Sequence, residues 1–293
     1  MNKCKFVIEK SVLPTVPREI QIFKTGKPSV ELQLSQLREL GVTFGFKSGL
    51  KGSIDHKEVS AVREGKRFLE FYKESGAVWY GDMENLWQEK PPDVRAPFKE
   101  NNKIAVERKL KTKSEEFLRN NKLLPPEAYF VGIETAEVAD ETKEPRVTEV
   151  QTNYGFKLGD IPVVGPGAKI TVNFGNNENI IGLFKAWRKI DEKQKLPSVD
   201  PEEALEKLKN SKLFADLEEN CEVSIEKFFL AYYALPVIEP QNFLFPVYVI
   251  KGQVTTPNFK HKFTRYIPAV SLDNMKKAEL LVETDAFPDP DLL

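Results

Sequence analysis

Apolar and polar residues recur along this chain with two spacings, which predict helices followed by antiparallel strands. In the segment 30–40, leucines return every third residue, as is typical of one helical face, and Gly41 follows as the expected C-cap. The segments 67–72 and 77–80 are apolar and aromatic, and a Glu-Ser-Gly turn separates them. The first part of the chain is therefore expected to form a helix and a hairpin.

The same order returns in the middle of the chain. A helix is expected over about 102–121, where Thr112 with Glu115 fits a capping box and Ser114 is a rival cap. The strands expected after it cover 128–138, 146–156, 168–174 and 180–190. Alternation within the second of them predicts one face with Glu149, Gln151 and Asn153 and an opposite face with Val150, Thr152 and Tyr154.

A third helix and a third group of strands end the pattern. Asp200 is the expected N-cap, Pro201 occupies the first helical position, and Glu203 lies in the first turn. The strands that follow are expected over 221–235, 243–252 and 259–270.

This threefold order predicts an α+β protein of tandem helix-on-antiparallel-sheet units. Each unit would be a sheet with a helix covering one face. The expected divisions are an N-terminal helix-plus-sheet unit (1–90), a Pro-rich linker (91–101), a central unit (102–197), a C-terminal helix-plus-sheet unit (198–284) and an acidic tail (285–293).

Two neighbouring stretches resemble a known family. The first is Asp160-Ile-Pro-Val-Val-Gly-Pro-Gly-Ala-Lys-Ile-Thr-Val-Asn-Phe-Gly, which continues to Ile181-Gly and Trp187-Arg188, and the second is Ser198-Val-Asp-Pro-Glu-Glu-Ala-Leu-Glu-Lys-Leu. This order of strand, glycine-bounded hairpin and Pro-Glu-Glu-Ala helix resembles the PepSY-like repeat proteins, which include bacterial regulators of the YycI and YycH kind. The resemblance implies cystatin-like units in tandem over about 100–270, outside the cytoplasm or anchored to a membrane, and it brings no catalytic residues.

Composition narrows the functional classes. The 293 residues include 43 basic and 44 acidic side chains, for a net charge of −1, but only 2 His and 2 Cys. The balanced charge argues against nucleic acid as a partner, because binding to a phosphate backbone depends on a basic surface. The scarcity of His and Cys excludes a disulfide framework and leaves any metal site dependent on carboxylates, so no metal and no cofactor are expected.

The compartment is predicted from the cysteines and the apolar runs. Cys4 and Cys221 are far apart in sequence and would pair only if the fold brought them together, so two free thiols are expected. The longest apolar run, 228–238, is too short for a membrane span, and the N-terminus lacks the apolar core of a signal peptide. The chain as it stands therefore looks cytoplasmic, and it would be secreted or anchored if a leader had been removed.

The glycine-rich segments and the histidines are weak candidates for a phosphate-binding or catalytic site. Gly165-Pro-Gly lacks the helix that a phosphate loop needs behind it, and the segment 45–52 lacks the Gly-Lys-Ser/Thr order of a nucleotide loop. A turn and a flexible loop are the favoured interpretations. His56 and His261 lie in polar surroundings without a nucleophile motif nearby, which favours surface positions.

Carboxylates, tyrosines and arginines are the remaining candidates for chemistry. A sheet face with such side chains can hold a small organic ligand, although core packing is the competing interpretation of the aromatic residues. The candidate catalytic residues, if the protein is an enzyme, are Glu149, Asp160, Tyr232, Tyr248 and Arg265. The candidate ligand-binding residues are Gln151, Trp187, Arg188, Tyr233 and Tyr266.

Two functions follow from these observations. The first is a non-catalytic binding or regulatory protein that recognises a protein or peptide along a sheet edge or a concave face. The second is a cofactor-independent enzyme, such as a cyclase, isomerase or hydrolase, that acts on a small apolar organic molecule. An open groove would favour the first function, and an enclosed cavity lined by tyrosine and carboxylate would favour the second.

Overall fold

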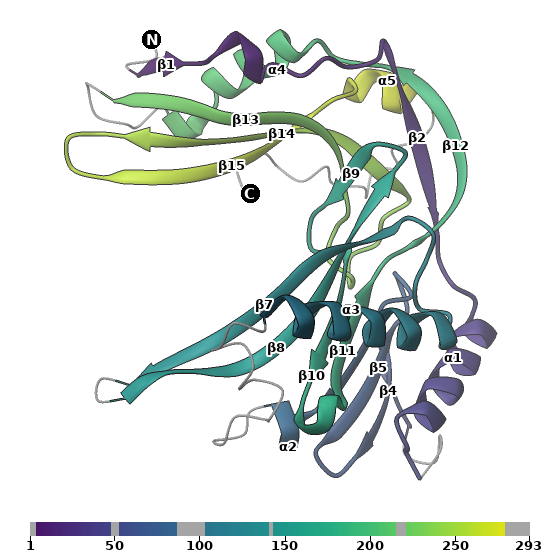
Figure 1. Cartoon of the computed structure of the whole chain (residues 1–293). Coiled ribbons are helices and arrows are strands. Elements are labelled where there is room, and N and C mark those ends of the chain that lie inside the picture. The colour runs from purple at the N-terminus through teal and green to yellow at the C-terminus, as the bar shows by residue number, and fades with distance from the viewer. Residues whose placement is uncertain (1–3, 48–52, 87–102, 141–142, 215–220, 279–293) are drawn as a thin grey trace.

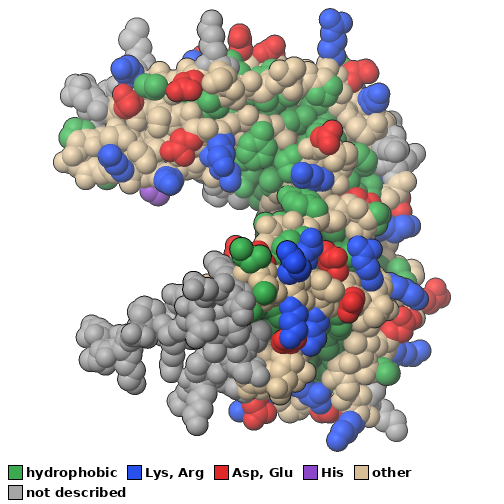
Figure 2. Space-filling model, in the orientation of Figure 1, with side chains coloured by type: hydrophobic (Ala, Val, Ile, Leu, Met, Phe, Trp, Pro, Cys, Tyr) green, Lys and Arg blue, Asp and Glu red, His purple; other side chains and the backbone are tan. Residues whose placement is uncertain are grey.

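The computed structural model describes residues 4–47, 53–86, 103–140, 143–214 and 221–278. The linker expected over 91–101 and the acidic tail expected over 285–293 lie outside these residues. Figure 1 shows two lobes, an upper and a lower one, which are connected along one side of the molecule. In the space-filling view of Figure 2, an open notch separates them on the other side.

The described elements divide between the two lobes as follows (Figure 1). The upper lobe contains β1 (Lys5–Val7), β2 (Glu19–Gly26), β12 (Lys189–Pro197), β13 (Glu222–Tyr233), β14 (Phe243–Thr255), β15 (Lys260–Pro268), α4 (Pro201–Lys209) and α5 (Leu272–Lys277). The lower lobe contains α1 (Val30–Thr43), β3 (Ser53–Asp55), β4 (Val59–Glu64), β5 (Arg67–Tyr72), β6 (Val78–Asp82), α2 (Met83–Leu86), α3 (Lys103–Asn120), β7 (Ala128–Asp140), β8 (Lys143–Leu158), β10 (Lys169–Phe174) and β11 (Ile180–Ala186).

One sheet runs through both lobes. Its main path follows the order β12-β2-β14-β13-β9-β8-β10-β11-β6-β5-β4-β3, and β1, β15 and β7 pair with β13, β14 and β8 beside this path. The short strand β9 (Ile161–Val164) connects the lobes, because it pairs antiparallel with β8 and parallel with β13. β1 also pairs parallel with β13, so the sheet is mixed.

The prediction of tandem helix-on-antiparallel-sheet units is wrong. The strands of the three segments pair with one another instead of closing into separate sheets. β2, from the first segment, pairs with β12 and β14, and β6 pairs with β11 from the central segment. Strand pairing is a long-range choice that local spacing does not encode, so the repeated helix-then-strands order carried no information about which strands are neighbours.

The predicted helix over 30–40 is confirmed, but its C-terminus is not at Gly41. The helix α1 begins after the N-cap Ser29, whose side chain accepts a hydrogen bond from the backbone N–H of Leu32, and it continues to Thr43. Gly45 has φ +68° and ends the helix in a Schellman motif, in which the N–H groups of Gly45 and Phe46 donate to the carbonyls of Val42 and Gly41. The wrong glycine was chosen because both positions follow apolar helical residues.

The later helices match their predictions in part. In α4, Asp200 caps the backbone N–H of Glu202 at 2.8 Å and Pro201 occupies the first turn, as expected. α3 also forms, but the predicted caps are wrong, because Thr112 and Ser114 lie inside the helix. The Ser114 hydroxyl is buried and lies 2.5 Å from the hydroxyl of Tyr154 on β8. It therefore fixes α3 on the sheet.

The helices cover one face of the sheet in each lobe. Leu37 of α1 and Leu110 of α3 are buried in the same core as Val150 and Val172 of the lower sheet. In the upper lobe, Phe214 precedes β13 and packs edge-to-face on Phe263 of β15. The lower lobe therefore keeps an open sheet face opposite its helices. In the upper lobe the opposite face is exposed at Lys227 and Lys251, whereas Val247 and Val249 on the same face are buried. Within the described residues, no helix is long and apolar enough to cross a membrane.

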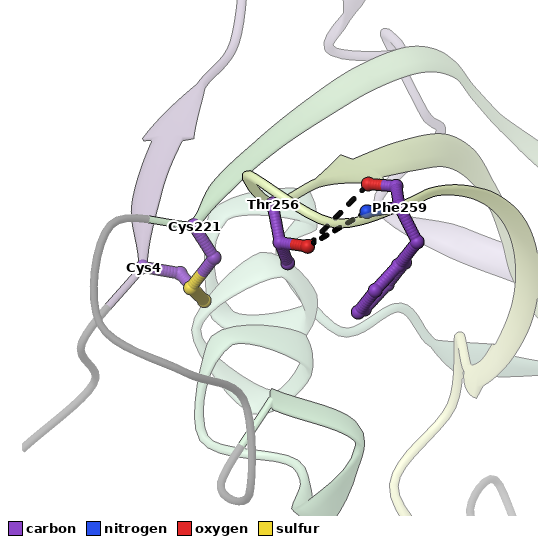
Figure 3. Close-up of a disulfide and its surroundings, with 4 residues drawn as sticks. All are labelled: Cys4, Cys221, Thr256 and Phe259. Carbon is purple, nitrogen blue, oxygen red and sulfur yellow. Dashed lines mark hydrogen bonds between the residues drawn. A yellow bond between two sulfur atoms is a disulfide. The ribbon is translucent and has the colours of Figure 1, made fainter.

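The prediction of two free thiols is wrong. Cys4 and Cys221 form a disulfide with a Cα–Cα distance of 4.6 Å (Figure 3). The parallel pairing of β1 with β13 brings them together, and the Lys5 N–H donates to the carbonyl of Cys221 at 2.9 Å. Beside the disulfide in Figure 3, the Thr256 hydroxyl accepts a hydrogen bond from the Phe259 N–H at 3.1 Å. The end of the β14–β15 hairpin thus lies next to the bridge.

Candidate functional site

The open face of the lower sheet carries a ladder of polar side chains. Register places Gln151 of β8 opposite Asn173 of β10, and both lie on the face away from α1 and α3. The Gln151 amide donates to the Glu134 carboxylate at 3.1 Å, and the Asn173 amide donates to the Glu149 carboxylate. Alternation had predicted this polar face of β8, and the predicted split is confirmed because Val150, Thr152 and Tyr154 are buried opposite it.

Aromatic side chains continue this face toward β6. The Trp79 side chain is 42% exposed, and it contacts the ring of Phe68 edge-to-face with a centroid distance of 4.8 Å. The Phe184 ring lies beside it at 6.4 Å, and the ammonium of Lys169 lies 5.4 Å from the centroid of Phe184. An exposed tryptophan that is held by two rings offers a rigid platform for an apolar group.

A groove of about 550 Å³ lies between these side chains and the loop that joins β13 to β14. Its polar wall includes Glu149 and Gln151, its floor includes Trp79 and Phe184, and Ile238 of the loop closes one side. The remaining lining residues that matter for its chemistry are Lys169, Thr171, Asn173, Met83 and Leu86. The groove is open to solvent, and its accessible surface is mostly apolar.

Arg188 positions the loop that closes the groove. Its guanidinium donates to the carbonyls of Leu235, Pro236 and Glu239 at 3.0, 2.9 and 2.7 Å. The side chain is buried, and desolvation lowers its pKa to about 10. Arg188 had been predicted to bind a ligand directly. The structure instead places it behind the loop, where it acts on the groove through the backbone.

The two tyrosines predicted for catalysis lie in the upper lobe. The Tyr232 hydroxyl donates to the carbonyl of Gln21 at 2.5 Å, and the Tyr248 hydroxyl donates to the carbonyl of Val199 at 2.6 Å. Both side chains are fully buried. Burial raises the pKa of Tyr248 to about 12 and also raises that of Tyr232. These hydroxyls connect β13 and β14 to neighbouring backbone.

The other predicted residues are dispersed. Asp160 is exposed in the turn between β8 and β9, and Arg265 donates to the carbonyl of its neighbour Thr264 at 3.0 Å. Tyr233 and Tyr266 form a tilted pair with centroids 4.7 Å apart in the upper lobe. Of the ten predicted site residues, the structure therefore brings Glu149 and Gln151 together in the groove, and Tyr233 and Tyr266 together elsewhere.

Trp187 lies at a second, smaller cavity of about 290 Å³. Its ring stacks on Phe156 at 4.0 Å, and the cavity is also lined by Glu127 and Lys185. Desolvation lowers the pKa of the Lys185 ammonium. No group of three His, Cys, Asp or Glu side chains suited to a metal ion occurs among the described residues.

Sequence reasoning missed Trp79, Lys169, Asn173, Phe184 and Ile238 as groove residues. A signal for two of them existed, since Lys169 and Asn173 occupy alternate positions of a predicted strand, as do the polar residues of β8. No signal existed for Trp79 or Ile238, because β6 and the β13–β14 loop reach this face only through long-range pairing.

Comparisons with known proteins add information on the fold alone. No protein-family model matches the chain, and no curated protein matches it. Among solved structures, the chain is similar to an uncharacterized protein from Eubacterium rectale ATCC 33656, with a TM-score of 0.50 and 9% sequence identity over 92% of this chain and 90% of that chain. The likeness extends over both lobes, and the PepSY-like resemblance stays a prediction.

Proposed function

We propose that this protein is a non-catalytic binding protein that recognises a protein or peptide partner in the groove of the lower lobe. The observation that carries the proposal is the open groove of about 550 Å³, with an aromatic floor at Trp79 and a polar wall at Glu149 and Gln151. An apolar side chain of a peptide fits against the tryptophan, and its backbone amides find acceptors and donors along the polar wall.

The alternative, a cofactor-independent enzyme, receives less support from the same observations. The hydroxyls of Tyr232 and Tyr248 donate hydrogen bonds to backbone carbonyls inside the upper lobe, so neither lies beside the carboxylates of the groove. An acid–base pair must lie within hydrogen-bond reach of one substrate. Glu149 remains the carboxylate with which this alternative is tested.

The disulfide bears on the compartment in which this binding protein works. Disulfides persist in oxidising compartments and are rare where thiols are kept reduced. We therefore include in the proposal that the protein works in an oxidising compartment. Thiol titration of the protein isolated from its native source, with and without denaturant, tests this part, and two reactive thiols would contradict it.

Selection from a peptide library on the intact protein tests the proposed groove. Peptides are selected on the wild type, and their affinities are then measured by fluorescence anisotropy against Trp79→Ala. The control is Phe259→Ala, which removes an exposed ring from the upper lobe. We expect Trp79→Ala to weaken binding by about ten-fold or more and the control to leave it unchanged.

Two results would count against the proposal. One is a set of selected peptides that bind the wild type and Trp79→Ala equally well. The other is turnover of a small molecule that Glu149→Gln abolishes, which would favour the enzyme. The carboxylate of Glu149 and the amide that replaces it are nearly the same size, so the comparison isolates its charge.

A further inference from the structure

Two lysines face each other directly on the open face of the upper sheet. The antiparallel register places Lys227 of β13 opposite Lys251 of β14, and both side chains are exposed. Like charges in directly opposite positions destabilise a sheet. In the described part of the chain, neither ammonium has an ion pair or a hydrogen bond. The sheet therefore carries a repulsive pair with no compensating contact.

Two further lysines extend this pair into a cluster on the same face. Lys262 of β15 is opposite Gln253 of β14, two residues beyond Lys251, and Lys260 is opposite Thr255. The four residues Lys227, Lys251, Lys260 and Lys262 are called the lysine face below. Diagonal neighbours in a sheet lie about 7–8 Å apart, so the cluster is continuous. Two acidic residues of β13 lie near it: Glu222 is paired with Lys5 at 4.0 Å, and Glu226 is exposed in the bulge beside Lys227.

Protection of an edge explains only part of the lysine face. Lysines on an edge strand discourage unwanted strand pairing, and this accounts for Lys260 and Lys262 on β15. It does not account for Lys251, because β14 is paired at this position with both β13 and β15. Lys251, which lies between two paired strands and directly opposite Lys227, is better explained by an anionic partner.

The free edge of β15 indicates the form of that partner. Within the described residues, β15 pairs with β14 alone, and its outer edge borders the notch between the lobes (Figures 1 and 2). Basic side chains are visible along this border in Figure 2. An open edge offers unpaired N–H and C=O groups to an extended peptide. Alternate side chains of such a peptide are about 6.8 Å apart, which matches Lys260 and Lys262 at alternate positions of β15.

We propose that the lysine face and the free edge of β15 bind an acidic segment of a protein partner, laid as an extended strand along β15 with its carboxylates directed at the lysines. A sulfated polysaccharide has no peptide backbone to pair with this edge. Single-stranded nucleic acid is held by aromatic platforms between the cations, whereas the residues in register with these lysines are Gln253, Thr255 and Thr264. This site is in the other lobe from the groove and does not depend on it.

The test uses the full chain and a fluorescent peptide of about ten residues that alternates Glu with Thr, long enough to span β15. The matched peptide has Gln in place of every Glu. We expect anisotropy to detect binding of the acidic peptide alone, and an increase in salt from about 50 to 500 mM to weaken it by about ten-fold or more. Equal binding of the Gln peptide would overturn the proposal.

Lysine variants locate the site. Lys227→Gln and Lys251→Gln are each expected to weaken binding by about two- to five-fold, as for exposed charge pairs. Lys195→Gln, which removes an exposed lysine from β12, is expected to have no effect. An acidic peptide that binds these three variants equally would overturn the proposal. Trp79→Ala is expected to leave the affinity for the acidic peptide unchanged. The proposal for the lysine face and the proposal for the groove can therefore be contradicted independently.

Two comparisons test the identity of the partner. Methylation of alternate backbone nitrogens of the acidic peptide is expected to abolish binding, because those N–H groups would pair with the edge of β15. Unchanged affinity would overturn the strand geometry. Tighter binding of a sulfated polysaccharide or of oligo-dT than of the peptide, with the same dependence on Lys251, would overturn the assignment to an acidic protein segment.

Discussion

Cys4 and Cys221 are joined by a disulfide across 217 residues, so the start of β1 is covalently fixed to the start of β13. The two strands also pair in parallel, with Phe6 in register with Val223. Phe6 in turn packs edge-to-face on Phe214 at 5.3 Å. The bridge thus attaches the N-terminal strand to the core of the upper lobe, which the rest of β13 helps to build.

Removal of this disulfide is expected to destabilise the protein. A cross-link that closes a long loop restricts the unfolded chain, and loss of such a bridge typically costs about 2–5 kcal/mol. The paired replacement Cys4→Ser with Cys221→Ser should therefore lower the free energy of unfolding in urea by this amount. A reducing agent should lower that of the wild type similarly and leave the double variant unchanged. Equal stability of the wild type with and without reductant would contradict the prediction.

The opposed lysines of the upper sheet predict a stabilising substitution. Lys251→Glu places a carboxylate opposite Lys227 and converts repulsion into attraction, which should raise the free energy of unfolding by about 0.5–1 kcal/mol. The gain should diminish in about 1 M salt, where screening shortens the range of the interaction. Lys195→Glu is the control, since Lys195 is opposite the neutral Gln21. If both substitutions changed the free energy of unfolding equally, the effect would come from net charge and the prediction would be wrong.

Arg188 is expected to be essential to the loop that closes the groove. Arg188→Met removes three hydrogen bonds from a charged donor and leaves the carbonyls of Leu235, Pro236 and Glu239 without that partner. We expect a loss of about 3 kcal/mol or more in urea unfolding, together with weaker binding of peptides selected for the groove. Arg188→Lys should recover little of either, because one ammonium cannot reproduce the fork of the guanidinium. Full recovery by lysine would contradict this role.

Buried tyrosines predict a loss of stability at high pH. Burial raises the pKa of Tyr154 and of Tyr248 to about 12, whereas tyrosine in an unfolded chain ionises near 10. The native state therefore retains protons that the unfolded chain releases between about pH 10 and 12. Their stabilising contribution is complete below pH 10 and is lost as the pH rises through 12.

Phenolate absorbance and circular dichroism, recorded over the same pH range, check this prediction. The phenolate signal of these two residues should appear together with the loss of secondary structure. Tyr248→Phe should weaken the dependence of stability on pH above 10, and below pH 10 it should be slightly less stable, because the hydrogen bond to Val199 is lost. Ionisation of Tyr248 in a protein that remains folded would contradict the argument.

Local structure was largely predictable because it depends on neighbours in sequence. The alternation around Gln151 identified both faces of β8, and Asp200 with Pro201 identified the start of α4. Both signals act within one turn or one strand. The C-terminus of α1 was misplaced by four residues, from Gly41 to Gly45, because both glycines follow apolar residues and only one of them has a positive φ.

The site was predictable only in part. Glu149 and Gln151 were singled out from their own strand, and they do line the groove. Trp79 and Ile238 were missed, because β6 and the β13–β14 loop are brought to that face by strand pairing and by the hydrogen bonds of Arg188. Tyr232 and Tyr248 were singled out for their chemistry, but their hydroxyls are bonded to backbone carbonyls.

The sequence by itself determined the net charge of −1 and predicted several elements, including α1, α3, α4 and both faces of β8, but it did not predict β2, β4 or β9. The tertiary structure alone decided that the strands form one mixed sheet, that Cys4 meets Cys221, and that Lys227 lies opposite Lys251. The physical reason is the same for all three. Helix capping and alternation are settled by residues a few positions apart, whereas strand register is settled by which distant surfaces can be buried together.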